Sequence, residues 1–224
     1  MTEINCLLNY NTIFEPGCRI FCGSHAASGY LLNLAAEISV KQPLHLLDFG
    51  NRCDMYFAAR QLRYLTRDPA AAMMNIRLQR AFTCYQAAAL LRQIEKFETG
   101  LPVIILDLLA PFLDENIKTA EIYRLFQEAT ELLRGVMRDR ALLIGVKPVP
   151  QHLAPDRVCL MGNLARNFGL IPVQDALPDG AVNSAGYQQR PAARVFGSYG
   201  VRGQKRKIPE LMNEQPALFD LTKM

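Results

Sequence analysis

The residues best suited to chemistry are an aspartate at the end of an apolar run and a loop of small residues. Asp107 directly follows Val103–Leu106, a run with three β-branched side chains. Such a run is typical of a central strand in a parallel sheet, buried on both faces. A carboxylate at the carboxyl end of such a strand lies where open α/β sheets bind ligands. Asp107 is therefore a candidate magnesium-holding residue, although an aspartate that caps the following turn has the same pattern.

The loop Gly23–Gly29 lies between an apolar stretch, Gly17–Cys22, and a stretch with helical spacing, Tyr30–Val40. A loop between strand and helix can bind phosphate, because backbone N–H groups and the helix N-terminus face the anion. Its spacing fits the pattern G-x-x-x-x-G-K-[ST]. The candidate nucleotide-binding residues, together with Asp107, are Gly23, Ser24, Ser28 and Gly29.

The chemistry of this loop departs from that pattern. Ser28 replaces the second glycine, Gly29 replaces the phosphate-binding lysine, and Tyr30 replaces the magnesium-binding hydroxyl. His25 could approach a phosphate, although a lone loop histidine is more often solvated. The loop therefore lacks both its point charge and its metal anchor.

Alternating strands and helices must position these residues. The pattern predicts further strands at Leu44–Phe49, Asn75–Ala81 and Ala141–Val146, and helices at Met55–Leu65 (with Asp54 as N-cap), Ala70–Met74, Cys84–Phe97 and Asn116–Arg138. This order indicates an α/β fold with a doubly wound, mostly parallel sheet flanked by helices. After Pro155 we expect a strand at Asp156–Met161, a helical turn at Asn163–Phe168 and an edge strand or hairpin arm at Ala193–Tyr199.

Three features occur in a specific order. A strand ends in the acidic Asp48, a D-P-x-x-x-x-x-N-I turn begins at Asp68, and a strand closes in Arg80-Ala81-Phe82-Thr83, with Gln86 early in the next helix. From Gly17 to Pro150 this order resembles the RecA-like recombinase superfamily. The resemblance is to paralogues of the archaeal and eukaryotic recombinases, or to ImuA-like accessory proteins. Another doubly wound ATPase, or a nucleotide-binding domain of different origin, is the alternative.

The resemblance implies a RecA-like P-loop NTPase core in residues 1–200, with a degenerate phosphate loop at Gly17–Gly29. The water-activating glutamate of the family is missing from the stretch after Asp48, although Asp48 itself is near. Phosphoryl transfer depends on positioning and charge stabilisation. We therefore expect a paralogue with no catalytic residue, no metal and no cofactor. The alternative is an active ATPase in which loop N–H groups and Asp107 bind ATP and magnesium.

Such paralogues act as accessory factors in DNA recombination, repair or SOS-linked translesion synthesis. The resemblance thus implies DNA and a RecA-family or polymerase-accessory protein as partners, in a homo- or hetero-oligomer. A purely structural subunit of a heteromer, without nucleic acid contact, is a further alternative.

A basic segment favours single-stranded DNA as the polyanion partner. Six cations and no acidic residue lie between Tyr187 and Lys207, interleaved with aromatic rings that can stack on bases. The candidate DNA-binding residues are Arg190, Arg194, Arg202, Lys205, Arg206 and Lys207. A merely solvated tail has the same composition.

Residues 201–224 are expected to form a basic, flexible tail. Within it, Gln215, Leu218 and Phe219 form a Q-x-x-L-F pattern. This pattern resembles the peptide by which bacterial polymerases and repair factors bind the sliding clamp, where a disordered segment supplies apolar anchors. Folding back of Leu218 and Phe219 onto the chain's own surface is the alternative.

Composition sets the remaining limits. The chain has 224 residues, half of them hydrophobic, and a net charge of +4. It contains no apolar run of the roughly 20 residues that span a bilayer, and its N-terminus has no secretion signal. Its six cysteines are scattered without a C-x-x-C pair, so we expect reduced thiols, no metal site, no membrane contact and a cytoplasmic location.

Overall fold

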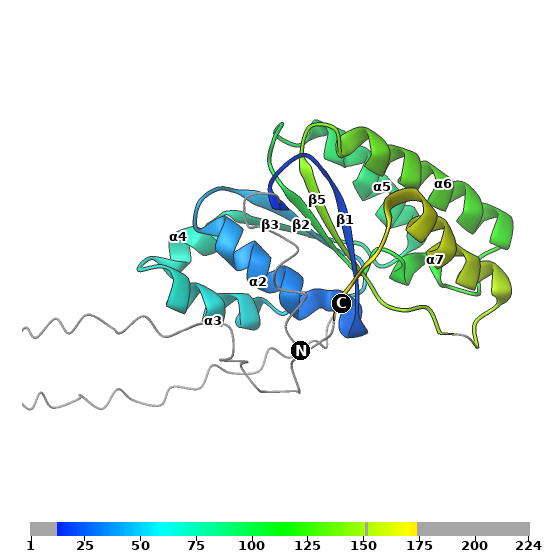
Figure 1. Ribbon diagram of the computed structural model, residues 1–224, viewed down its shortest axis with the longest axis horizontal. Coiled ribbons are helices and arrows are strands. Elements are labelled where there is room, and N and C mark those ends of the chain that lie inside the picture. Colours follow the sequence, from blue (N-terminus) through cyan, green and yellow to red (C-terminus); the bar gives the residue numbers. More distant parts are fainter. Residues whose placement is uncertain (1–12, 151, 174–224) are drawn as a thin grey trace, which may run out of the picture. The chain divides into compact units, whose positions relative to one another are not determined.

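The computed structural model describes residues 13–150 and 152–173, in which a six-stranded parallel sheet carries helices on both faces (Figure 1). The strand order is β3-β2-β4-β5-β1-β6. The strands are β1 (Gly17–Cys22), β2 (Leu44–Asp48), β3 (Ile76–Arg80), β4 (Val103–Leu106), β5 (Ala141–Val146) and β6 (Ile171–Pro172). The predicted α/β class and parallel sheet are confirmed, and the apolar run before Asp107 is an interior strand.

The helices form two layers. Figure 1 shows α2, α3 and α4 on one face of the sheet and α5, α6 and α7 on the other. Their bounds are α2 (Ser28–Ser39), α3 (Met55–Leu65), α4 (Pro69–Met74), α5 (Cys84–Gln93), α6 (Thr119–Val136) and α7 (Pro155–Phe168), with 3₁₀ helices η1 (Ser24–Ala27), η2 (Ile94–Lys96) and η3 (Ala110–Phe112).

Strand β4 shows why its sequence is continuously apolar. Ile104 and Leu106 belong to the core that α2 covers, whereas Val103 and Ile105 belong to the core beneath α5 and α6. All four side chains are fully buried. Successive side chains of a strand point to opposite faces, so a strand covered on both sides needs apolar residues at every position.

Side-chain caps fix the starts of three helices. Asp54 accepts hydrogen bonds from the N–H groups of Tyr56 and Phe57 at 2.9 and 3.0 Å, which confirms the predicted N-cap of α3. Asp68 caps α4 through Ala71 N–H at 3.0 Å, and Thr83 caps α5. Each such cap stabilises its helix by about 1 kcal/mol.

The predicted strand at Asp156–Met161 is wrong, because this stretch belongs to α7. Pro155 occupies the first turn of the helix, where its missing N–H costs no hydrogen bond. Leu160 and Leu164 are buried four residues apart, which is helical spacing. The helix absorbs the predicted turn at Asn163–Phe168, and the predicted strand at Ala193–Tyr199 lies outside the described residues.

The buried guanidinium of Arg157 fixes α7 to the segment before α6. Its Nη2 donates to the carbonyl oxygens of Asp114 and Ile117 at 3.1 and 2.7 Å. The arginine therefore lies inside the molecule because it satisfies backbone acceptors there.

The five cysteines of the described segments form no disulfide. No helix within residues 13–150 and 152–173 has the length and apolarity needed to cross a bilayer.

Candidate functional site

The candidate site lies at the carboxyl edge of the sheet. All strand pairs are parallel, so the segments after β1, β2 and β4 leave the sheet at this same edge. Strand β5 separates β1 from β4, and neighbouring strands lie about 4.8 Å apart, so the ends of β1 and β4 are about 10 Å apart. The structure thus brings the Gly23–Gly29 loop and Asp107 to one edge.

Unusual backbone geometry concentrates at this edge. Among the described residues, the non-glycine residues with positive φ are His25 (49°), Ala26 (58°), Ala27 (52°), Asn51 (53°) and Asp107 (56°). They follow the carboxyl ends of β1, β2 and β4. A left-handed residue with a side chain costs about 1 kcal/mol or more and persists only where its surroundings hold it. Such strain clusters at functional sites, and it marks this edge independently of any motif.

The loop after β1 packs onto the sheet. Ala26 and Ala27 are fully buried, and the carbonyl oxygen of Ala26 lies over β5. A Cβ on Gly145 would be only 2.2 Å from that oxygen, so the contact requires glycine. Ala26 N–H donates to the Gly23 carbonyl at 3.2 Å, and Ser28 N–H donates to the His25 carbonyl. These two N–H groups serve the loop's own carbonyls and are not available to an anion.

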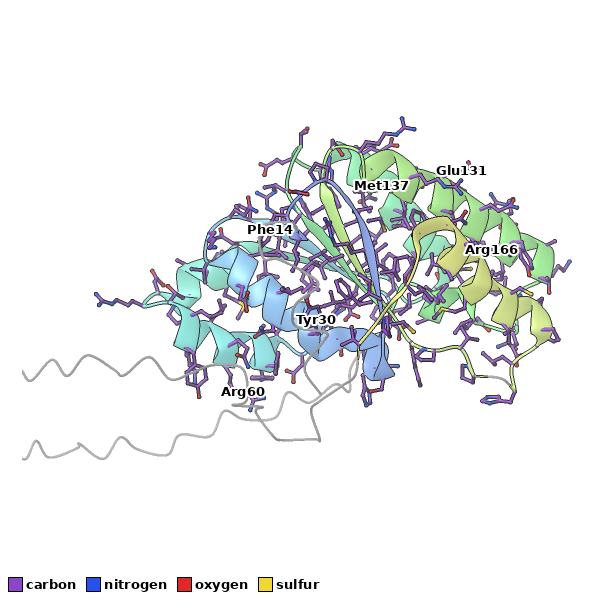
Figure 2. All side chains as sticks on the ribbon, viewed as in Figure 1. Phe14, Tyr30, Arg60, Glu131, Met137 and Arg166 are labelled. Carbon is purple, nitrogen blue, oxygen red and sulfur yellow. The ribbon has the colours of Figure 1, made fainter. Side chains whose placement is uncertain are left out.

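Tyr30 occupies the first turn of α2 (Figure 2). Its ring packs against Phe21 of β1 with centroids 5.1 Å apart. Burial, assisted by the charge of Glu37, raises the pKa of the Tyr30 phenol above its ordinary value. The side chain at this position is therefore a neutral packing group at physiological pH.

Arg52 binds the carboxylate of Asp107. Its Nε donates to Oδ2 of Asp107 at 3.1 Å; the Asp107 side chain is 5% exposed and that of Arg52 is 30% exposed. The turn after β2 approaches closely because Gly50 has no side chain: a Cβ there would be 2.5 Å from Asp107 Cβ. The guanidinium thus supplies to Asp107 the positive charge that a metal ion supplies to such a carboxylate in an ATPase.

The sequence reasoning missed the role of Arg52. Arg52 belongs to no motif of the sequence, and its partner lies 55 residues further along the chain. No spacing pattern connects two such positions. The only local signal was an arginine just beyond the acidic end of a strand.

Asp48 is fully engaged by its own turn and by β3. Its Oδ1 accepts from Arg52 N–H at 2.8 Å and its Oδ2 accepts from Cys53 N–H at 3.1 Å. Arg80, directly opposite on β3, forms an ion pair with Oδ2 at 3.3 Å. These contacts hold the turn that carries Arg52, so Asp48 is a structural group and not a base aimed at water.

The thiol of Cys53 is neutral. Burial, with the nearby charge of Asp48, raises its pKa to about 11. Within the described part of the chain, no cluster of three His, Cys, Asp or Glu side chains could hold a metal ion.

The other predicted sites lie outside the described residues. These are the DNA-binding candidates Arg190, Arg194, Arg202, Lys205, Arg206 and Lys207, and the clamp-like candidates Gln215, Leu218 and Phe219. The predicted boundary at residue 200 lies outside them as well.

Comparison with known proteins adds no assignment: no family model matches the chain, and no curated protein does so.

Proposed function

We propose that this chain is a non-catalytic member of the RecA-like recombinase superfamily. It acts as an accessory factor in DNA recombination, repair or translesion synthesis and binds DNA and partner proteins. It does not hydrolyse ATP. The observation that carries the proposal is the ion pair between Arg52 and Asp107.

The strand order differs from those of the dinucleotide-binding fold and the flavodoxin fold, two common nucleotide-binding folds. In the dinucleotide-binding order 3-2-1-4-5-6 and the flavodoxin order 2-1-3-4-5, the first strand lies beside the second. Here β1 lies between β5 and β6, and β4 separates β2 from β5. This arrangement argues against the alternative of a Rossmann-type nucleotide-binding domain.

Magnesium and a triphosphate do not fit the residues at this edge. The positions of the expected lysine and hydroxyl carry Gly29 and the packed ring of Tyr30. Asp107 already pairs with a guanidinium. A magnesium ion would have to displace Arg52 and leave the guanidinium beside a second cation, which is electrostatically unfavourable. These contacts argue against the alternative of an active ATPase.

The residues at this edge fit a structural role better than a catalytic one. Arg52 and Arg80 neutralise the two carboxylates there, and the strained loop is held against β5 by buried contacts. Because the charges are satisfied within the chain, the edge needs no ligand to be stable. We therefore assign the function of the chain to surfaces that bind DNA or partner proteins, and not to a small ligand at this edge.

Nucleotide titration tests the proposal. A fluorescent ATP analogue with magnesium should show no saturable binding, and phosphate release should equal that of a buffer blank; an active RecA-type ATPase serves as positive control. Micromolar affinity for the analogue would refute the proposal.

The accessory role has a separate test. Co-purification from the native host followed by mass spectrometry should yield a recombinase or polymerase-accessory protein. The chain should also bind a single-stranded oligonucleotide at low salt. Failure of both would leave only the structural-subunit alternative.

A further inference from the structure

The solvent face of α3 carries two arginines between two tyrosine rings. Its four outward side chains are Tyr56, Arg60, Arg63 and Tyr64. At about 100° per residue these positions span an arc of about 100°. Ala58 and Leu62 lie on the opposite side and are fully buried, Leu62 against residues of α2 and α4. The four outward residues therefore make no contribution to the core.

The two tyrosines are among the most exposed large side chains of the described residues. Tyr56 is 86% exposed and Tyr64 is 83% exposed. They are eight positions apart, which is about 12 Å along the helix axis. Each ring thus has an open surface on which a base could stack, with Arg60 and Arg63 between the two rings.

The same face is positively charged. Arg67, exposed in the turn after α3, adds a third guanidinium, and α3 itself contains no acidic residue. No carboxylate in residues 13–150 or 152–173 forms an ion pair with Arg60, Arg63 or Arg67. The nearest carboxylates in sequence, Asp54 and Asp68, accept hydrogen bonds from the first turns of α3 and α4.

Figure 2 shows Arg60 on the side of α3 that points away from the sheet. Its guanidinium carbon lies 6.0 Å from the centroid of the Phe57 ring on the same helix. At this distance the ring attracts the cation only weakly, so the contact leaves the charge at the surface. The charge is thus available to a partner outside the chain.

We propose that the α3 face, defined as Tyr56, Arg60, Arg63, Tyr64 and Arg67, binds single-stranded nucleic acid. Guanidinium groups bind phosphates and tyrosine rings stack on bases, the combination that recognises single strands without sequence preference. The rings favour nucleic acid over an acidic protein, because a carboxylate-rich partner would use the arginines and leave two flat aromatic surfaces in water. The inference rests on the proposed function and adds a second set of DNA-binding residues to the predicted tail residues.

Anisotropy titration of a labelled oligothymidine with the full chain tests this site. Charge reversal of Arg60, Arg63 and Arg67 to Glu should weaken binding at low salt at least tenfold. Loss of three phosphate contacts should reduce the slope of log K against log salt by about 2. A matched control reverses three exposed arginines on or next to α6 and α7, namely Arg134, Arg138 and Arg166, and should change affinity less than threefold.

Two double variants test the contribution of the Tyr56 and Tyr64 rings. Tyr56→Ala with Tyr64→Ala should weaken binding about fivefold or more, whereas Tyr56→Phe with Tyr64→Phe should retain it, because stacking needs the ring and not the hydroxyl. All these residues are exposed, so the thermal midpoint should stay within a few degrees of the parent chain.

The outcomes separate the two claims. If the α3 variant binds like the control while Lys205→Glu, Arg206→Glu and Lys207→Glu abolish binding, the inference about α3 is wrong and the DNA binding of the proposed function stands. If the unmodified chain binds no oligothymidine at low salt, both claims fail. If the α3 variant keeps its DNA affinity but loses an acidic protein partner, the face is a protein interface and the inference is overturned.

Discussion

The ion pair between Arg52 and Asp107 gives the most informative prediction. We expect Arg52→Met and Asp107→Asn each to destabilise the chain, and the double variant to be less destabilised than the sum of the two. Methionine keeps the apolar stem of Arg52 without its charge. Asparagine suits position 107 because it tolerates the left-handed backbone found there (φ 56°) better than alanine does.

The magnitude follows from the contact. Two unit charges about 4 Å apart attract by about 4 kcal/mol at an effective dielectric constant of 20. Desolvation of the nearly buried Asp107 carboxylate and the 30% exposure of Arg52 offset much of this attraction. Hydrogen bonds to charged groups stabilise proteins by about 1.5–3 kcal/mol, and the partial exposure places this pair at the lower end. We therefore expect a coupling free energy of about 1.5 kcal/mol.

Urea unfolding of the parent chain, the two single variants and the double variant measures this coupling. Arg92→Met and Glu128→Gln provide the control cycle, because Arg92 is exposed and this pair should couple more weakly than Arg52 with Asp107. A coupling below about 0.3 kcal/mol for Arg52 and Asp107 would show that the guanidinium does not neutralise Asp107. The main structural support for a non-catalytic site would then be lost.

Three further predictions concern other parts of the chain. His45, stacked on Phe97 at 3.8 Å with neither ring nitrogen hydrogen-bonded within the described residues, has a pKa lowered to about 4 by burial and by the charges of Arg77 and Arg140. The unfolded chain binds a proton at His45 more readily than the folded chain does. The contribution of neutral His45 to the free energy of unfolding should therefore be fully present above pH 6.5, and it should fall by at most ~3 kcal/mol as the pH drops toward 4. His45→Leu should flatten this part of the plot of urea midpoint against pH, and an unchanged plot would contradict the assignment. Gly145→Ala should destabilise the chain by about 1–3 kcal/mol in urea, because its Cβ meets the Ala26 carbonyl, whereas Gly162→Ala, with open space in α7, should be neutral or stabilising; equal effects would mean that the loop does not press on β5. A peptide of residues 209–224 should retain a bacterial sliding clamp in a pull-down and lose it when Leu218 and Phe219 are changed to Ala; equal retention of the clamp by both peptides would exclude the motif.

Much of the fold was predictable because its signals are local. The β-branched run Val103–Leu106 predicted an interior strand, and Asp54 predicted the start of α3. The prediction failed at Asp156–Met161, where Pro155 opens a helix and the burial of Arg157 depends on carbonyl oxygens of a distant segment. A short apolar stretch does not distinguish strand from helix, and distant packing decides.

The sequence by itself determined which groups are present at the candidate site: a carboxylate after an interior strand, and a loop without lysine or an aliphatic hydroxyl at the expected positions. Only the tertiary structure decided what those groups do. Arg52 reaches Asp107 because β2 and β4 are neighbours in the sheet, and the loop after β1 packs closely because Gly145 of β5 leaves room for it. Chemical identity is a property of each residue, whereas an ion pair or a close contact depends on which strands lie side by side.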